Sequence, residues 1–354
     1  MKDLDTFFCS GDFSAFSAAF PTADTADFYV LQGENEWAKQ KLFAALCKYA
    51  ANAQIQYTRI LHTHNAAKVV AVYLPQQHRF AADADYFPSL VLRQPHAKRF
   101  CVPALVRVPP TAGAEHGALL LQASAAQTRA ETYLRAAAEA QNASADLLAR
   151  CADSTKVFRA VLEVLNAAAP CAKRERGKIL FRRKLSAVTA WGIHTVYTPF
   201  REKGIRTAVL RDVYGGVAPL FLQGLCTACI EAGLDAQLYT APLSDTPAHL
   251  VLPACGIAFF TENDLHPFPF RETAVLGASR FLRHGDARAA LPELRAYRDT
   301  AAEALECAAF SLFESDEVRA EIRQFAETHT DSNALHCVQD ELTDAFFSFR
   351  HFAE

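Results

Sequence analysis

Hydrophobic and polar positions follow two similar series along the chain. When residues 28–57 are laid on residues 206–239, the apolar positions of the two segments coincide. The matched pairs are Leu31 with Leu210, Leu46 with Leu225 and Cys47 with Cys226, and 210 − 31, 225 − 46 and 226 − 47 all give 179. Twice that separation is close to the full length of 354 residues. The pattern therefore predicts an internal duplication.

Both series predict the same order of elements. Each begins with a short apolar run, passes through a turn into about four turns of helix, and ends in a second short run, at 55–60 and 236–240. This order is typical of a βαβ unit. A further apolar run follows at 69–73 in the first copy and at 256–260 in the second, which also has an extra run at 250–253.

Long helical segments rich in alanine, leucine and charged residues close each copy. They are predicted at about 119–166 and, with several breaks, at 287–349. A proline, a glycine and a charge run within 166–178 indicate a linker. We therefore predict an α/β fold of two tandem halves, residues 1–176 and 177–354. Each half is expected to be a mainly parallel sheet flanked by helices, with a helical extension.

The turn between the first strand and the helix carries the first candidate chemistry. Free backbone N–H groups and the helix dipole favour an anion at a helix N-terminus. The phosphate-binding pattern G-x-x-x-x-G-K-[ST] adds a lysine for the phosphates and a hydroxyl for Mg²⁺. In the first copy Gly33 and Lys39 remain, whereas Ala38 and Gln40 replace the second glycine and the hydroxyl. Gly33 and Lys39 are therefore the candidate nucleotide-binding residues.

Further strings follow the order of a known family. They are Ser186-Ala-Val-Thr189 with Gly192, Pro242-Leu-Ser-Asp245, Leu250-Val-Leu-Pro253, Gly256-Ile-Ala-Phe259 and His266-Pro-Phe268 in the second half, and Lys68-Val-Val-Ala-Val72 with His78 in the first. With the turn motif, this order resembles bacterial ATPase-like proteins that carry two tandem P-loop halves in one chain. The resemblance covers nearly the whole chain and implies a P-loop NTPase-like fold in each half, with ATP as the ligand. We expect the two halves to pack as a pseudo-dimer.

The second half departs from the family pattern where the chemistry is expected. Asp212 stands in place of the first glycine, Ala218 in place of the lysine and Pro219 in place of the hydroxyl. An aspartate repels phosphate, and a proline removes an N–H donor from the helix start. The acidic residue that ends the later strand and helps to hold Mg²⁺ is also replaced, by Tyr73 in the first half and Thr261 in the second.

The first half leaves two interpretations of its loop open. Lys39 can pair with a phosphate, although Glu34 and Glu36 in the same loop repel one. Alternatively, these two carboxylates pair with Lys39 and leave the loop closed.

Other candidate sites have simple structural explanations. Cys226 and Cys229 form a C-x-x-C pattern. This pattern indicates either a redox or metal-binding pair or, because both cysteines lie inside a predicted helix, two residues of the core. His62 and His64 are interpreted as a polar strand end rather than metal ligands.

Two further features concern ligands outside the turn motif. His78 and His266 occupy matching places past a strand and either bind a ligand or cap a turn. A basic cluster could bind phosphate or RNA, or be a solvated linker; its members are Lys173, Arg174, Arg176, Lys178, Arg182, Arg183 and Lys184.

Composition narrows the function classes. The chain is 51% hydrophobic and 21% charged with a net charge of -3, which indicates a globular protein and argues against a surface built for nucleic acid or an anionic membrane. No apolar stretch reaches the roughly 18 residues of a membrane span, and residues 1–13 do not read as a signal peptide. We therefore expect a cytoplasmic protein whose ten cysteines are mostly reduced.

The leading hypothesis is a catalytically degenerate P-loop ATPase-like protein, a scaffold or binding protein without ATP hydrolysis. It implies no catalytic residue, no metal and no cofactor, and a protein partner of unknown identity. The alternative is an ATPase or nucleotide-dependent switch that binds ATP through Gly33 and Lys39. A third interpretation, a phosphate- or RNA-binding protein acting through the basic cluster, is the least favoured.

Overall fold

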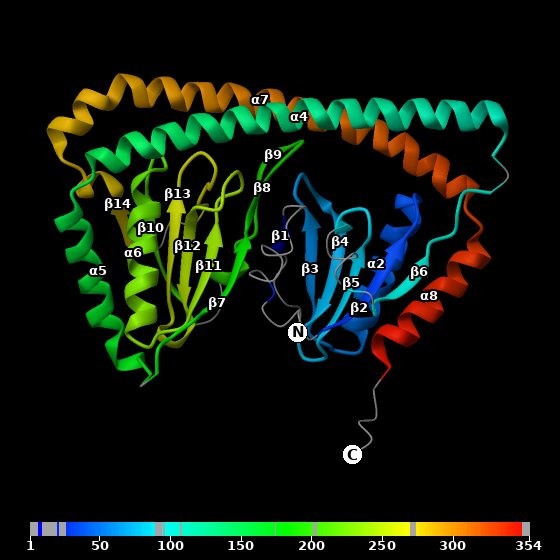
Figure 1. Ribbon diagram of the computed structural model, residues 1–354, viewed down its shortest axis with the longest axis horizontal. Helices are drawn as coiled ribbons and strands as arrows, with labels where there is room; N and C mark the ends of the chain where they lie inside the picture. The colour runs from blue at the N-terminus through cyan, green and yellow to red at the C-terminus, as the bar shows by residue number, and fades with distance from the viewer. Residues whose placement is uncertain are drawn as a thin grey trace, which may run out of the picture. The chain divides into compact units, whose positions relative to one another are not determined.

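Alternating strands and helices build an α/β fold in the computed structural model of the chain (Figure 1). The structure describes residues 6–8, 20, 26–88, 94, 96–106, 108–173, 175–200, 204–269 and 274–348. The chain divides into two compact units: unit 1 comprises residues 1–127 and 312–354, and unit 2 comprises residues 128–311.

Unit 1 contains a mixed sheet with the order β6-β2-β5-β4-β3-β1. Its elements are β1 (Thr6–Phe8), β2 (Asp27–Gln32), α2 (Glu36–Asn52), β3 (Thr58–His62), β4 (Asn65–Leu74), β5 (Arg79–Asp83) and β6 (Lys98–Cys101). Strand β2 runs parallel to β5 and β6, β1 runs parallel to β3, and β4 is antiparallel to both of its neighbours.

Unit 2 repeats this arrangement with the sheet order β14-β10-β13-β12-β11-β7. Its elements are β7 (Ile179–Lys184), β8 (Ser186–Thr189), β9 (Gly192–Thr195), β10 (Arg206–Arg211), α6 (Val217–Glu231), β11 (Ala236–Thr240), β12 (Pro247–Leu252), β13 (Ile257–Glu262) and β14 (Ala274–Gly277). Short 3₁₀ helices lie at η2 (Ala169–Cys171), η3 (Thr198–Phe200), η4 (Pro253–Cys255) and η5 (Ala278–Phe281). Strand order and direction in unit 2 therefore match those of unit 1.

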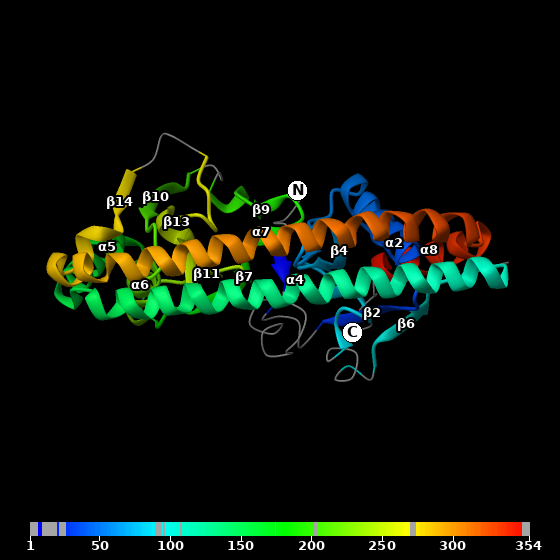
Figure 2. The same ribbon diagram turned by 90° about the horizontal axis from the view of Figure 1, so that it is seen from above.

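Four helices follow the two sheets. They are α4 (Pro110–Cys151), α5 (Ser154–Ala168), α7 (His284–His329) and α8 (Ser332–Phe347). Both α4 and α7 cross from one unit to the other, at residues 127/128 and 311/312. Within each unit their segments lie side by side (Figure 1, Figure 2). As a result α8, from the end of the second copy, packs on α2 in unit 1, and α5, from the first copy, packs on α6 in unit 2.

The two compact units therefore differ from the predicted halves, residues 1–176 and 177–354. Residues 128–176 belong to unit 2 and residues 312–354 to unit 1. The physical reason is the length of α4 and α7, since each helix carries the chain out of one unit before it ends. The sheets are also less parallel than expected, because an antiparallel strand, β4 or β12, lies between a parallel group of three strands and a parallel pair.

The strand β5 corrects the alignment of the two copies. The run at 69–73 lies in β4, whose counterpart is β12, while the counterpart of β13 is β5. Leu31 pairs with Asp83 in the same register as Leu210 pairs with Thr261. The run at 250–253, predicted as an extra run of the second copy, thus has a counterpart in β4 of the first. The prediction that Tyr73 replaces the acidic residue at the end of the later strand is wrong, because Asp83 occupies that place. Tyr73 instead packs beside the ring of Phe80.

The match of His78 to His266 is also wrong. His78 lies before β5, where its φ is 49°, and its counterpart is Gly256, with φ 60° before β13. The carbonyls of both residues accept the same bond, from Asp27 N–H and Arg206 N–H, each at 2.8 Å. His266 follows β13 at the opposite end of the strand. His78 is therefore a turn residue.

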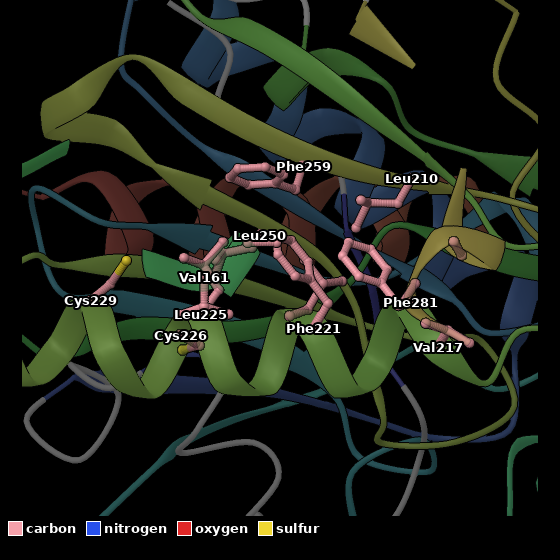
Figure 3. Close-up of a cluster of buried hydrophobic side chains, with 14 of the residues drawn as sticks. Val161, Leu210, Val217, Phe221, Leu225, Cys226, Cys229, Leu250, Phe259 and Phe281 are labelled. Carbon is pink, nitrogen blue, oxygen red and sulfur yellow. The ribbon is translucent and has the colours of Figure 1, made fainter. Parts of the chain in front are cut away.

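Apolar side chains on the strands and helices form one buried cluster in unit 2 and two in unit 1. In unit 2, the buried face of α6 points at the sheet, with Phe221 and Leu225 next to Leu250 and Phe259 from the strands (Figure 3). In unit 1, the core between α2 and the sheet includes residues of α8, and Phe346 is fully buried there. The helix that completes each core thus comes from the other copy of the sequence.

We expect Phe346→Ala to lower the free energy of unfolding by about 3 kcal/mol, because it removes a buried ring and leaves a cavity. The matched variant Phe310→Ala removes a ring that is 64% exposed on α7 and should change stability by less than about 1 kcal/mol. Urea titration of both variants measures the difference. Equal effects would show that α8 does not complete the core of unit 1.

Candidate functional site

The strand–helix turn of the first copy, loop 1 (residues 33–38), is held by its own chain. Gly33 has φ 133°, and a side chain there would lie 3.2 Å from the carbonyl oxygen of Val102. Asn35 is buried and caps α2 by accepting the N–H of Ala38 at 3.1 Å. Its amide nitrogen donates to Pro103 O at 3.1 Å and to Thr330 Oγ1 at 2.7 Å. Segments of unit 1 therefore occupy the approach to this helix N-terminus.

The ammonium of Lys39 lies between two carboxylates, those of Asp83 and Asp85. It lies 2.6 Å from Asp83 Oδ1 and 2.5 Å from Asp85 Oδ2, and the lysine side chain is 2% exposed. The amide N–H of Asp85 also donates to Asp83, at 3.0 Å. Burial raises the pKa of Asp83, and the charge of Lys39 opposes that rise. Lys39 thus already has two anionic partners.

The expected pairing of Lys39 with Glu34 and Glu36 is not what the structure shows. Glu36 pairs with Lys68 at 3.2 Å and with Arg319 at 2.9 Å. Gln40, in the position of the Mg²⁺-binding hydroxyl, exchanges two hydrogen bonds with the backbone of Val69, at 2.8 and 3.0 Å. The carboxylates that hold Lys39 come from the end of β5, a strand that the sequence pattern missed.

The corresponding turn of the second copy, loop 2 (residues 212–217), contains a buried carboxylate. One oxygen of Asp212 accepts the backbone N–H groups of Val217 and Ala218, at 2.8 and 2.7 Å. Burial raises the pKa of the Asp212 carboxyl, and these amide hydrogens oppose the rise. The carboxylate caps α6 at the place where a P-loop receives a phosphate. Asp212 is therefore a built-in anion rather than only a repulsive charge.

Helix α4 closes loop 2 from outside. A side chain at Gly216 would lie 2.7 Å from Leu148 Cβ and 2.9 Å from Ala145 Cα, so only glycine fits beneath the helix. Ser144 Oγ donates to Tyr214 O at 3.1 Å. The backbone of loop 2 is thus covered by the chain itself.

The acidic residue expected at the end of the later strand differs between the copies. In the first copy it is Asp83, which pairs with Lys39. In the second copy Thr261 occupies the matching place, as expected, and its buried hydroxyl has no hydrogen-bond partner among the described residues. The first copy therefore has a lysine and an acid at these two places, and the second copy has Ala218 and Thr261 there.

A cavity lies beside each loop. Cavity 1, in unit 1, has a volume of about 200 Å³ and is bounded by the start of α2, the β3–β4 turn and residues 312–323 of α7. Cavity 2, in unit 2, has about 210 Å³ and is bounded by loop 2, the β11–β12 connection, the residues that follow β13, and parts of α4 and α7. Both lie at the carboxyl ends of parallel strands, where ligands of α/β sheets usually bind.

Two buried histidines, His249 and His266, lie at cavity 2, and His266 is one of the residues that line it. His266 Nδ1 lies 2.9 Å from Ser186 Oγ, and the ring centroids of His266 and His249 are 4.6 Å apart. Burial and then the charge of Lys184 lower the pKa of His266 to about 3. Burial also lowers the pKa of His249 well below its ordinary value. Both rings are therefore neutral at pH 7, which suits packing more than proton transfer.

The remaining candidates are structural. Cys226 and Cys229 are buried in the core of unit 2, where burial raises the pKa of Cys229 to about 12, so it supplies no thiolate at pH 7. His62 ends β3, as the interpretation of a polar strand end predicted.

The basic cluster is partly neutralised. Arg182–Lys184 belong to β7 rather than to a linker, and Arg174 lies outside the described residues. Lys173 pairs with Asp235, and Arg176 with Glu231 at 2.5 Å. These pairs leave less free positive charge than the sequence suggested.

Asp212→Ala should lower the free energy of unfolding by about 2 kcal/mol, because it removes the cap of α6 and leaves two buried N–H groups without an acceptor. Asp299→Ala, at an exposed position of α7, serves as the matched control and should stay within about 0.5 kcal/mol. Chemical denaturation compares them. The assignment of Asp212 as a built-in anion is wrong if both variants behave alike.

His266 should make the protein less stable in acid. Its pKa in the folded chain, about 3, lies below the roughly 6.5 of an unfolded histidine, so its contribution is complete above pH 6.5 and is lost as the pH falls towards 3. Between pH 8 and pH 5 this single group should remove about 2 kcal/mol. His266→Asn should flatten the dependence of the denaturation midpoint on pH, whereas His336→Gln, at an exposed site, should leave it unchanged.

Neither metal-binding clusters nor membrane-spanning helices emerge from the residues described above. No three His, Cys, Asp or Glu side chains among them are grouped to hold a metal ion. No helix in the same ranges combines the length and apolarity needed to cross a membrane. Comparison with known proteins gives no match to a protein family, a curated protein or a solved structure.

Proposed function

We propose that the protein is a catalytically degenerate P-loop ATPase-like protein with two tandem P-loop halves, which acts as a scaffold or binding protein without ATP hydrolysis. The carboxylate of Asp212, bound to the N–H groups of Val217 and Ala218, carries the proposal. A phosphate needs those same donors at the helix N-terminus. In loop 2 the carboxylate of Asp212 therefore occupies the position that a bound phosphate would take.

The order of elements supports the P-loop part of the proposal. In each unit a strand leads through a tight loop into a helix, and the strand pairs in parallel with the later one, β2 with β5 and β10 with β13. In the first copy the helix carries Lys39, and Asp83 ends the parallel strand. A lysine and an acid at these two places are the arrangement of a P-loop ATPase.

The proposed lack of hydrolysis is supported by the groups that hydrolysis requires. Mg²⁺ needs the hydroxyl of the motif, and Gln40 and Pro219 stand at that position in the two copies. Gln40 is bound to the backbone of Val69. With a closed loop in each copy, the fold is retained for its shape and its surface, which is the role of a scaffold for a protein partner.

A second candidate function, nucleotide binding at Gly33 and Lys39, is favoured by one observation. Lys39 and Asp83 form a buried pair, so a nucleotide phosphate could take the place of the carboxylates around the lysine. Binding in this mode requires loop 1 to open away from Val102 and Pro103.

Calorimetric titration with ATP, with and without Mg²⁺, separates the two functions. The scaffold proposal expects no saturable heat and no phosphate release in either condition. The informative variant is Lys39→Gln with Asp83→Asn, because removal of one partner alone leaves a buried charge that costs about 3–5 kcal/mol. Micromolar ATP binding that this double variant abolishes would overturn the scaffold proposal and establish the nucleotide site.

A further inference from the structure

Cavity 1 has a strongly cationic lining that the proposed function does not use. Four cations line it, Lys41, Lys68, Arg319 and Arg323, against two carboxylates, Glu36 and Asp316. Without counting the histidines, the lining has two more positive than negative charges. Lys39 is not among the residues that line it, because its ammonium is held by Asp83 and Asp85.

The two carboxylates are held at the wall of cavity 1. Glu36 lies between Lys68, at 3.2 Å, and Arg319, at 2.9 Å. Burial raises the pKa of Glu36, but these two cations outweigh burial and the pKa lies below its ordinary value. Asp316 accepts a hydrogen bond from the side-chain amide of Asn65 at 3.0 Å. Glu36 thus orients two of the cations, and the two carboxylates do not cancel the four positive charges of the lining.

Two histidines, His62 and His64, also line cavity 1. The N–H of His64 donates to Nδ1 of His62 at 3.1 Å, so in the neutral ring of His62 the proton is on Nε2, which can donate. Burial, together with the charges of Lys68, His64 and Arg319, lowers the pKa of His62 well below its ordinary value. The positive potential that disfavours a histidinium here favours an anion.

Cavity 2 occupies the matching place in unit 2 and lacks these cations. Helices α4 and α7 end at Cys151 and His329, and 329 − 151 gives 178. At that spacing the counterparts of Arg319, Arg323 and Lys68 are Gln141, Ala145 and Thr246, and Gln141, Ala145 and Thr246 all line cavity 2. The same cavity therefore forms without the cations, so the fold does not require them.

We propose that cavity 1 binds a small phosphate ester, with the phosphate among Lys68, Arg319 and Arg323. An arginine fork matches two phosphate oxygens, and lysine adds a point charge. A bound phosphate replaces Glu36 as the anionic partner of Arg319 and Lys68. The volume of about 200 Å³ lies below the roughly 300–1,000 Å³ of sites for drug-sized ligands, which selects a compact molecule such as a sugar phosphate.

Calorimetry with ribose 5-phosphate, inorganic phosphate and uncharged ribose tests this site. We expect saturable binding of ribose 5-phosphate at 150 mM salt, weaker binding of inorganic phosphate and none of ribose. The double variant Arg319→Gln and Arg323→Ala, which copies the residues of cavity 2, should weaken binding at least tenfold. Arg295→Gln, at an exposed site on the same helix, is the matched control and should bind as the unaltered protein does.

Two further variants keep the result interpretable. Lys41→Gln changes an exposed side chain that carries no risk to folding, and it should weaken ribose 5-phosphate binding about threefold. The variant Lys39→Gln with Asp83→Asn should bind ribose 5-phosphate normally, which separates cavity 1 from a nucleotide site in loop 1. The proposal is overturned if ribose binds as well as ribose 5-phosphate, if nothing binds saturably, or if the Arg319/Arg323 variant binds unchanged.

Discussion

Apolar contact between a central helix and a tail helix from the other copy is the constraint on which each unit depends. Helix α2 packs against both its sheet and α8, and α6 packs against both its sheet and α5. Each central helix is thereby fixed on two sides, and so is the loop at its N-terminus. The charges of the two loops act in a rigid frame, where a buried group must find its partner within the chain.

The two loops meet this requirement with opposite charges. Loop 1 is followed by a buried cation, Lys39, which is neutralised by carboxylates from the end of β5. Loop 2 contains a buried anion, Asp212, which is satisfied by the amides of its own helix. The strand–helix turn therefore has a buried lysine beside it in one copy and a buried aspartate in the other, because each copy supplies the groups that bind its own charge. This internal satisfaction supports a role that depends on the fold more than on turnover.

The sequence revealed what depends on local periodicity and missed what depends on distant partners. The repeated strand–helix–strand order follows from apolar spacing over short windows. Strand β5 was missed because it is short and bounded by Arg79 and Asp83, two buried charged residues that read as a polar loop. The two terminal nitrogens of the Arg79 guanidinium donate to the carbonyls of Phe346 and Ser348, more than 260 residues away. Without β5 the sequence could not identify Asp83 as the partner of Lys39. The pattern of α4 likewise does not indicate which of the two sheets the following helix, α5, packs on.

The exchange of tails has a consequence for how such a chain can arise. In a chain that holds one copy alone, the long helix leads the tail away from its own sheet, and the central helix stays bare until a second chain supplies its tail. Two identical chains complete each other in the manner of a domain-swapped dimer. Joining the copies end to end replaces that concentration-dependent encounter with an intramolecular one. The fused copies can then diverge separately, so a change tolerated in one need not be tolerated in the other.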